Sequence, residues 1–536
     1  MAKNGFSRLL AITAAIVLLS ACAPRNDSGQ NLTTLNRGNQ AEVKSLDPDF
    51  IDDQWEAFLV GDMIVGLTTD AANGDPMPGV ATKWEMSPDG KTWTFHLRDS
   101  VWSDGLPVTS QDFVYAWRRL IDPKIAAPYA YYLWLIKNGE AISNGKLPPS
   151  ALGIQAVDDK TLVITLEHPA PYFPEYLLHQ TTWPVPRHLV KKLGNAWSQP
   201  ANYVANGPYI VKEWVPNDHL TMVRNPKFYD AAHVRLQTVN YYPTQDNVAA
   251  INRLRSGDLD TLYTLPAVKI DWLRTNMKKE LSIIPNLSNF YIALNVQHKP
   301  LNDIRVREAL NLAYNREELT YQIIKLGDPP AYSFVPPGVA NYPQGAHFAF
   351  RSLGYPERIK EAQALMRAAG YGPDNRLKLS YETTTMPDSK RYAAAYQAML
   401  KAIYVDIDIL QTDSQIHYRN LQQHNFDIAA AAWVADFNDA TNFLDLLKTG
   451  SGNNYGLYSN PKYDALLAKA QDTVDAKTRG ELLKQAEQLA LDDYAVVPIR
   501  FGQTLDIIMP QVKGWIANPR NFNRSRWLWK EAVQPQ

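Results

Sequence analysis

The stretch AAAAWVADFNDA at residues 429–440 combines side chains that could do chemistry. Four alanines precede Trp433, and Asp436 follows that tryptophan by three residues. Small side chains let another molecule approach the backbone closely, and a carboxylate there could hold a charged group that needs a fixed partner. In the alternative interpretation the alanines fill a tight core, and Asp436 only shapes a turn or caps a helix.

Enzyme motifs are absent from the sequence. There is no G-x-S-x-G, H-E-x-x-H or glycine-rich phosphate loop, and no two of the ten histidines are spaced i, i+4 to hold a metal. Asp258 and Asp260 are a carboxylate pair of the kind a glycosidase needs, but turn residues are the simpler interpretation. We therefore expect no cofactor and no metal site, and a secreted hydrolase that uses scattered carboxylates stays open as an alternative.

The elements that position Asp436 can be predicted from their patterns. FDIAAAAWV (426–434) is a short apolar run typical of a strand, and a helix begins within FNDATNFLDLL (437–447). Along the whole chain strands alternate with amphipathic helices, which predicts an α/β protein with mixed sheets. Asp436 then lies just past the carboxyl end of a strand, where open α/β sheets place their ligand crevices.

Length and composition limit the class of protein. A chain of 536 residues is too long for one hydrophobic core, so two to four domains are expected. The net charge of −1 gives no reason to expect nucleic acid as a partner. The fourteen tryptophans and twenty-eight tyrosines either fill cores or line a binding cleft.

The N-terminus predicts export and a lipid anchor. Two basic residues precede the uncharged run LLAITAAIVLL (9–19), which is too short to span a bilayer and is typical of a signal peptide. The run ends in LSAC, which is similar to a bacterial lipobox, and Cys22 is the only cysteine in the chain. We predict a signal peptide over 1–21, lipid attachment at Cys22 and a flexible tether over 22–40, with an ordinary signal peptide as the alternative.

Several longer segments resemble one protein family. They are SLDP (45–48), PGVATKWEMSPDGKTWTFHLRDSVWSDGLPVTSQDFVYAWRRLIDP (78–123), NGPYIVKEW (206–214), NRLRSGDLD (252–260), NVQHKPLNDIRVREALNLAYNRE (295–317) and FDIAAAAWVADFNDATNFL (426–444). From about residue 40 onward the chain resembles the extracellular solute-binding proteins of bacterial ABC importers, in the oligopeptide- and dipeptide-binding branch. The resemblance implies a monomeric receptor in the periplasm or cell envelope that hands short peptides to an ABC permease.

The resemblance also implies a three-lobed periplasmic-binding-protein fold, in which two lobes close on the ligand by hinge bending. Lobe I would comprise 41–65, 187–284 and 504–536. Lobe II would be 66–186, and lobe III would be 285–503.

The binding residues are likewise implied by the family. Its peptides lie extended and pair their backbone with protein strands, and an aspartate three residues after a tryptophan binds the peptide's α-ammonium group. These residues are Trp433 and Asp436 here. The resemblance assigns further contacts with the peptide to Ala432, Val434, Tyr129 and Gln54.

The sequence departs from the family at the other end of the ligand. Relatives place basic side chains that meet peptide carboxylates where this chain has Asp388, Leu421 and Ala430. We predict that Arg500 supplies the missing cation, with Arg419 as second choice. The alternative is that both arginines face solvent. The departure also leaves room for other cargo of this family, such as murein peptides, haem, nickel chelates or oligosaccharides.

Overall fold

The computed structural model describes residues 31–263, 265 and 270–533. The predicted signal peptide and Cys22 lie outside these residues. Within them, no helix is both long enough and apolar enough to cross a bilayer.

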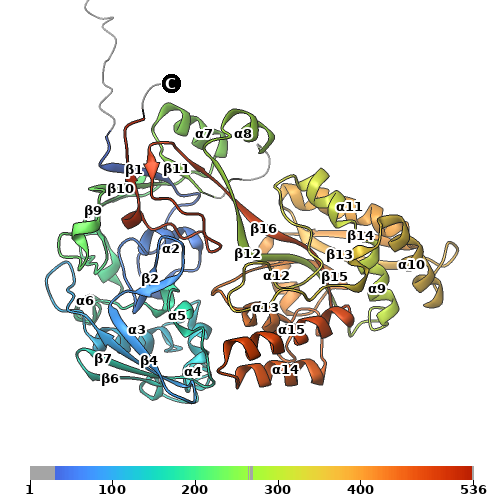
Figure 1. The fold of residues 1–536 in the computed structure, drawn as a ribbon, viewed down its shortest axis with the longest axis horizontal. Coiled ribbons are helices and arrows are strands. Elements are labelled where there is room, and N and C mark those ends of the chain that lie inside the picture. The colour runs from blue at the N-terminus through green and yellow to red at the C-terminus, as the bar shows by residue number, and fades with distance from the viewer. Residues whose placement is uncertain (1–30, 264, 266–269, 534–536) are drawn as a thin grey trace, which may run out of the picture.

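A ten-stranded mixed sheet runs through both halves of the molecule (Figure 1). β13 pairs in parallel with β14 and β15, β1 pairs in parallel with β10 and β11, and the other neighbours are antiparallel. In spatial order the strands are β14 (Val405–Thr412), β13 (Leu377–Thr384), β15 (Ile428–Val434), β12 (Leu281–Leu294), β16 (Val496–Ile508), β11 (Thr261–Leu262), β1 (Thr34–Gly38), β10 (Thr238–Tyr242), β9 (His219–Arg224) and β8 (Tyr209–Val215).

Smaller sheets and the helices complete the fold. An antiparallel sheet is formed by β4 (Ala81–Met86), β5 (Thr92–Leu97), β7 (Thr161–Thr165) and β6 (Ile154–Asp158), and two-stranded sheets by β2 (Thr68–Asp70) with β3 (Pro76–Pro78) and β17 (Val512–Lys513) with β18 (Trp529–Lys530). The helices are α2 (Gln54–Val60), α3 (Ser110–Leu120), α4 (Gly139–Ser143), α5 (Phe173–Tyr176), α6 (Arg187–Leu193), α7 (Asn247–Ser256), α8 (Ile270–Asn276), α9 (Ile304–Ala313), α10 (Tyr355–Ala368), α11 (Pro387–Lys401), α12 (Ser414–Gln422), α13 (Thr441–Leu444), α14 (Pro461–Gln471), α15 (Ala476–Asp492) and a π-helix at Glu318–Ile324. The mixed α/β architecture predicted from the sequence is confirmed.

One sequence prediction about the N-terminal region is wrong. Residues 34–38 were expected to belong to a flexible tether, but they form β1 in the middle of the large sheet. β1 pairs with β10 and β11, and Leu35 is fully buried. The strand TLNRG is too short and too polar to be predicted from its sequence. It forms because the neighbouring strands β10 and β11 supply its hydrogen-bond partners.

Among the strands that the structure describes, β12 and β16 alone carry the large sheet from one half of the molecule to the other (Figure 1). The two strands are antiparallel, and their register shifts between Pro285 and Asn289. A register shift of this kind bends a strand locally and weakens the ladder. The crossing therefore contains a break in the regular hydrogen-bond ladder, where the two strands can bend.

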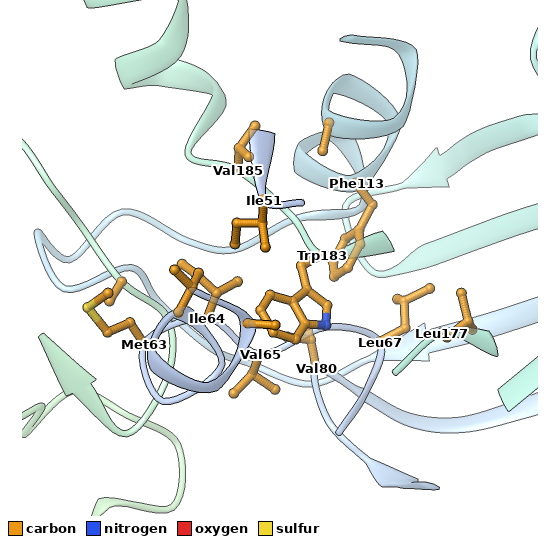
Figure 2. Close-up of a cluster of buried hydrophobic side chains, with 14 of the residues drawn as sticks. Ile51, Met63, Ile64, Val65, Leu67, Val80, Phe113, Leu177, Trp183 and Val185 are labelled. Carbon is orange, nitrogen blue, oxygen red and sulfur yellow. The ribbon is translucent and has the colours of Figure 1, made fainter. Parts of the chain in front are cut away.

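The hydrophobic cores follow the same division. One large cluster draws its residues from 35–263 and the C-terminal segment, and a second large cluster draws them from 287–499. A third, smaller cluster lies in residues 250–277 with Leu505 and Ile507. Figure 2 shows part of the first cluster, where Trp183 packs among side chains that include Val65 and Phe113. Because residues predicted for lobes I and II share this core, these two lobes are held together by buried apolar area.

Candidate ligand-binding site

β15 carries the sequence stretch that suggested a binding site. At one end the Asn295 N–H donates to the Asp427 carbonyl at 3.0 Å, and at the other the Ala435 N–H donates to the Leu287 carbonyl at 2.8 Å. Both bonds join β15 to β12, and backbone groups alternate sides along an antiparallel strand. The odd-numbered residues of β15 therefore bond to β12, and the even-numbered ones face the opposite edge.

That opposite edge is open over part of its length. β13 pairs with β15 only at Ile428 and Ala429, and the Ala430 carbonyl accepts a hydrogen bond from His417 Nε2 at 2.8 Å. Ala432 and Val434 follow, with no strand beside them in the described part of the sheet. Their backbone N–H and C=O groups can bond an added strand.

Asp436 lies directly beyond this open edge. Its side chain is half-buried, and in the described chain no lysine, arginine or histidine lies within ion-pair distance of it. Burial raises the pKa of the carboxyl to about 7, although a hydrogen bond from the Asn442 side chain opposes the shift. The site thus holds a poorly solvated carboxyl group that a cation would stabilise in its ionised form.

Asn442 fixes the geometry of this corner, and sequence reasoning missed it. Its Oδ1 accepts the Trp433 indole N–H at 2.7 Å and the Asp436 backbone N–H at 3.3 Å. One side chain on the short helix α13 therefore positions both members of the predicted pair. The only sequence signal was that Asn442 falls within the quoted segment 426–444.

Aromatic side chains from the other half of the molecule face Asp436. Burial raises the pKa of Tyr129 to about 12, and the field of Asp436 adds to the shift. Burial and the field of Asp436 also raise the pKa of Tyr131. Its ring stacks on that of Tyr129, with the ring centroids 5.4 Å apart. Tyr131 is 42% exposed, so part of this aromatic surface is free to contact a ligand.

Phe437 joins the two halves beside the site and was not predicted. Its ring stacks on Tyr172 with centroids 5.2 Å apart and also contacts Tyr132 and Tyr176. A residue next to Asp436 therefore packs into the opposite wall.

Gln54 is the first residue of α2 and is half-buried. The fields of its neighbours Asp52 and Asp53 contribute to the raised pKa of Tyr129. These two carboxylates already have a cation, because Lys44 Nζ lies 3.0 Å and 3.2 Å from them. The structure thus brings Gln54 to the side of the cleft that carries Tyr129.

Arg500 lies in the same cross-strand row as Ala432, with Phe290 between them. Its guanidinium group packs 3.4 Å from the centroid of the Phe290 ring and forms an ion pair of 2.5 Å with Asp328. Asp328 is fully buried, so the charge of Arg500 is neutralised within the protein. The role of Arg500 as partner of a ligand carboxylate stays a prediction.

Replacing Arg500 with methionine tests that role. The ion pair leads us to expect a loss of about 2 kcal/mol of unfolding free energy, since a buried carboxylate loses its partner. Because Asp328 already neutralises Arg500, we expect the affinities for a peptide and for its C-terminal amide to change by the same factor, a result that would contradict the sequence prediction. Chemical denaturation and calorimetric titration measure the two effects. A selective loss for the free-carboxylate peptide would instead establish Arg500 as the ligand's cation.

The positions that depart from the family are scattered around this cleft. Asp388 pairs with Arg391 at 3.1 Å, Leu421 is fully buried, and Ala430 is half-buried. Arg419, the second-choice cation, is exposed on α12. It lies two residues from His417, which faces β15, and residues at i and i+2 do not share a helix face, so Arg419 points away from that strand.

The two carboxylates considered for a hydrolase differ in their surroundings, since Asp258 is exposed and Asp260 has a structural role. Asp260 is buried, forms an ion pair of 2.9 Å with Lys530, and accepts the Asn36 backbone N–H at 2.8 Å. It holds chain segments together in the large sheet.

Comparison with known proteins agrees with this architecture. Residues 75–455 match the family described as "Bacterial extracellular solute-binding proteins, family 5 Middle". The chain is 38% identical over 515 residues to the periplasmic oligopeptide-binding protein OppA of Salmonella typhimurium, covering 95% of this chain and 94% of that one. It is 34% identical over 532 residues to the probable deoxycholate-binding periplasmic protein YgiS of Escherichia coli, covering 98% of both. A solved structure, the unliganded open form of the murein tripeptide-binding protein MppA, superposes with a TM-score of 0.82 at 34% identity, covering 93% of this chain and 98% of that one.

A mixed sheet crossed by two strands, with an open strand edge and an unpaired carboxyl group beside the crossing, defines a solute-binding protein of the periplasmic type. The chain belongs to the bacterial extracellular solute-binding proteins of family 5. This is a family of binding proteins, so the predictions of a non-enzymatic receptor and of a periplasmic-binding-protein fold are confirmed.

Proposed function

We propose that this protein is a peptide receptor of an ABC importer that binds short peptides through their free α-ammonium group. The observation that carries the proposal is Asp436, a carboxyl group with no basic partner among the residues that the structure describes, placed at the end of an open strand edge. Ala432 and Val434 would bond the peptide backbone, which makes recognition independent of side-chain identity. Trp433, Tyr129 and Gln54 complete the proposed site.

Two of the relatives named above differ in cargo, since one is an oligopeptide-binding protein and the other a probable deoxycholate-binding protein. Deoxycholate is an anion, and the Asp436 carboxyl group in the cleft is also negative when it is ionised. Bringing two like charges together in a poorly solvated site is unfavourable. The charge of the site therefore favours a ligand with a cationic group, as a peptide has.

The proposed motion follows from the two separate cores. Lobes I (41–65, 187–284, 504–536) and II (66–186) would move together against lobe III (285–503), bending where β12 and β16 cross. The packing of Phe437 among three tyrosines would then hold the closed form. Lipid attachment at Cys22 would hold the receptor at a membrane of the cell envelope.

Native mass spectrometry of the purified protein, followed by calorimetric titration after ligand removal, tests this function. We expect short peptides with free N-termini to be retained and to bind, and deoxycholate not to compete. Competition by deoxycholate, together with no binding of any tri- to pentapeptide, would contradict the proposal.

A further inference from the structure

The tyrosines that face Asp436 from the other half of the molecule differ in exposure. Tyr131 lies on the 3₁₀-helix Ala130–Leu135 and is 42% exposed. The tyrosines that pack against Phe437 are at most 9% exposed: Tyr132, Tyr172 and Tyr176. Among the described aromatic rings Tyr131 stacks on Tyr129 alone. Tyr131 therefore keeps free ring surface that the contact between the two halves does not cover.

Contacts between neighbouring residues place Tyr131 close to Asp436. The ring of Tyr132, the next residue, contacts the ring of Phe437, the residue after Asp436, with the centroids 6.4 Å apart. Successive Cα atoms are about 3.8 Å apart, so the two chain segments meet here. Burial is the first cause of the raised pKa of Tyr131, and the field of Asp436 is the second. The exposed ring surface thus lies in the part of the cleft that holds the Asp436 carboxyl group.

The strand across the cleft offers apolar surface at the same place. Val434 is the last residue of β15, two residues before Asp436, and it is 61% exposed. The carboxylates that precede α2, on the Tyr129 side of the cleft, already pair with Lys44. Two exposed apolar side chains, one from each half of the molecule, therefore lie near the carboxyl group. A ligand side chain enclosed between them would lose contact with water, which is favourable when that side chain is apolar.

We propose that Tyr131 makes the receptor prefer peptides whose first residue has a large apolar or aromatic side chain. The inference rests on the proposed function, because it takes the ligand's α-ammonium group to be at Asp436. That group is attached to the first Cα atom, so the first side chain begins beside the carboxyl group. The backbone bonds of the open edge are the same for every peptide, and the Tyr131 ring adds a preference at one position. Closure of the cleft buries the first side chain between Tyr131 and Val434.

Calorimetric titration of tripeptides with phenylalanine or alanine at the first position, followed by two alanines, tests the proposal. With the wild-type protein we expect the phenylalanine peptide to bind at least tenfold more tightly, and phenylalanine at the second or third position to gain less than threefold. Tyr131→Ser should reduce the first-position ratio to below threefold, whereas Tyr131→Phe keeps the ring and should keep the ratio. Tyr321→Ser, which removes an exposed tyrosine from the π-helix Glu318–Ile324, is the matched control and should also keep it.

A wild-type ratio below threefold, or a ratio that survives Tyr131→Ser, would overturn the preference while peptide binding itself stands. Loss of the ratio in Tyr131→Phe would also overturn it, because the hydroxyl group rather than the ring would then decide. No binding of any of these peptides would overturn the proposed function instead.

A second measurement uses the wild-type protein and so does not depend on the folding of a variant. A tripeptide with photoreactive benzoylphenylalanine at its first position should crosslink to the segment that contains Tyr131, as mapped by mass spectrometry after proteolysis. Crosslinks confined to other segments would overturn the proposal.

Discussion

Replacing Asp436 with asparagine is expected to weaken the binding of a peptide with a free α-ammonium group by about 100- to 1,000-fold. The change removes the anionic partner of a poorly solvated cation, a loss of about 3–4 kcal/mol for a close charge pair. Asparagine keeps the size of the side chain, so the Asn442 contacts that position this corner need not change. Calorimetric titration against a single tripeptide measures the effect.

N-acetylation of the same tripeptide provides the control, because it removes the charge from the ligand. The wild-type protein should lose most of its affinity on acetylation, whereas Asp436→Asn should bind the free and acetylated peptides within about threefold of each other. The two changes then form a double-mutant cycle with a large coupling energy. Independent, additive effects would show that Asp436 does not contact the ammonium group.

The same residue makes binding depend on pH. Burial raises the pKa of Asp436 to about 7 in the ligand-free protein, so the carboxyl group is increasingly protonated as the pH falls below that value. An ammonium group requires the ionised form, and binding must then release a proton. Affinity should fall by up to about tenfold per pH unit below 7, and Asp436→Asn should show no such slope.

Replacing Asp70 with asparagine is expected to lower the unfolding free energy by about 3–5 kcal/mol, the cost of breaking a buried ion pair from one side. Asp70 lies on β2, and its two carboxylate oxygens accept hydrogen bonds from Arg520 Nη1 at 2.6 Å and from Arg524 Nε at 2.8 Å. All three side chains are at least 93% buried, so the variant would leave two guanidinium groups without their anion. The bridge ties the C-terminal segment to the half of the molecule that carries Tyr129.

The pH dependence of this loss has a definite sign. Burial opposes ionisation of Asp70, but Arg524 and Arg520 outweigh it and hold the pKa of the carboxyl below its ordinary value. The stabilisation is therefore present above the unfolded-state pKa and disappears as the pH falls through the folded-state pKa. Chemical denaturation at pH 7 and at pH 3 measures the loss of unfolding free energy caused by Asp70→Asn, which should be smaller at pH 3. Asp374→Asn, at an exposed site, is the control. A loss below 1 kcal/mol at pH 7 would contradict the prediction.

The sequence by itself determined the class of the protein and the local elements of the site. The apolar run before Trp433 predicted a strand, and its alternation with helices predicted mixed α/β architecture, because these patterns depend on neighbouring residues along the chain. Family resemblance then pointed to Asp436 and its flanking backbone.

The tertiary structure decided the features of the site that depend on contacts between residues far apart in the sequence. That Ala432 and Val434 face an open edge depends on where β13 leaves β15, and β13 lies about 50 residues earlier in the chain. Neutralisation of Arg500 by Asp328 joins residues 172 positions apart. β1 was missed for the same reason. Hydrogen-bond partners and burial arise from packing between distant segments, and local sequence patterns do not encode them.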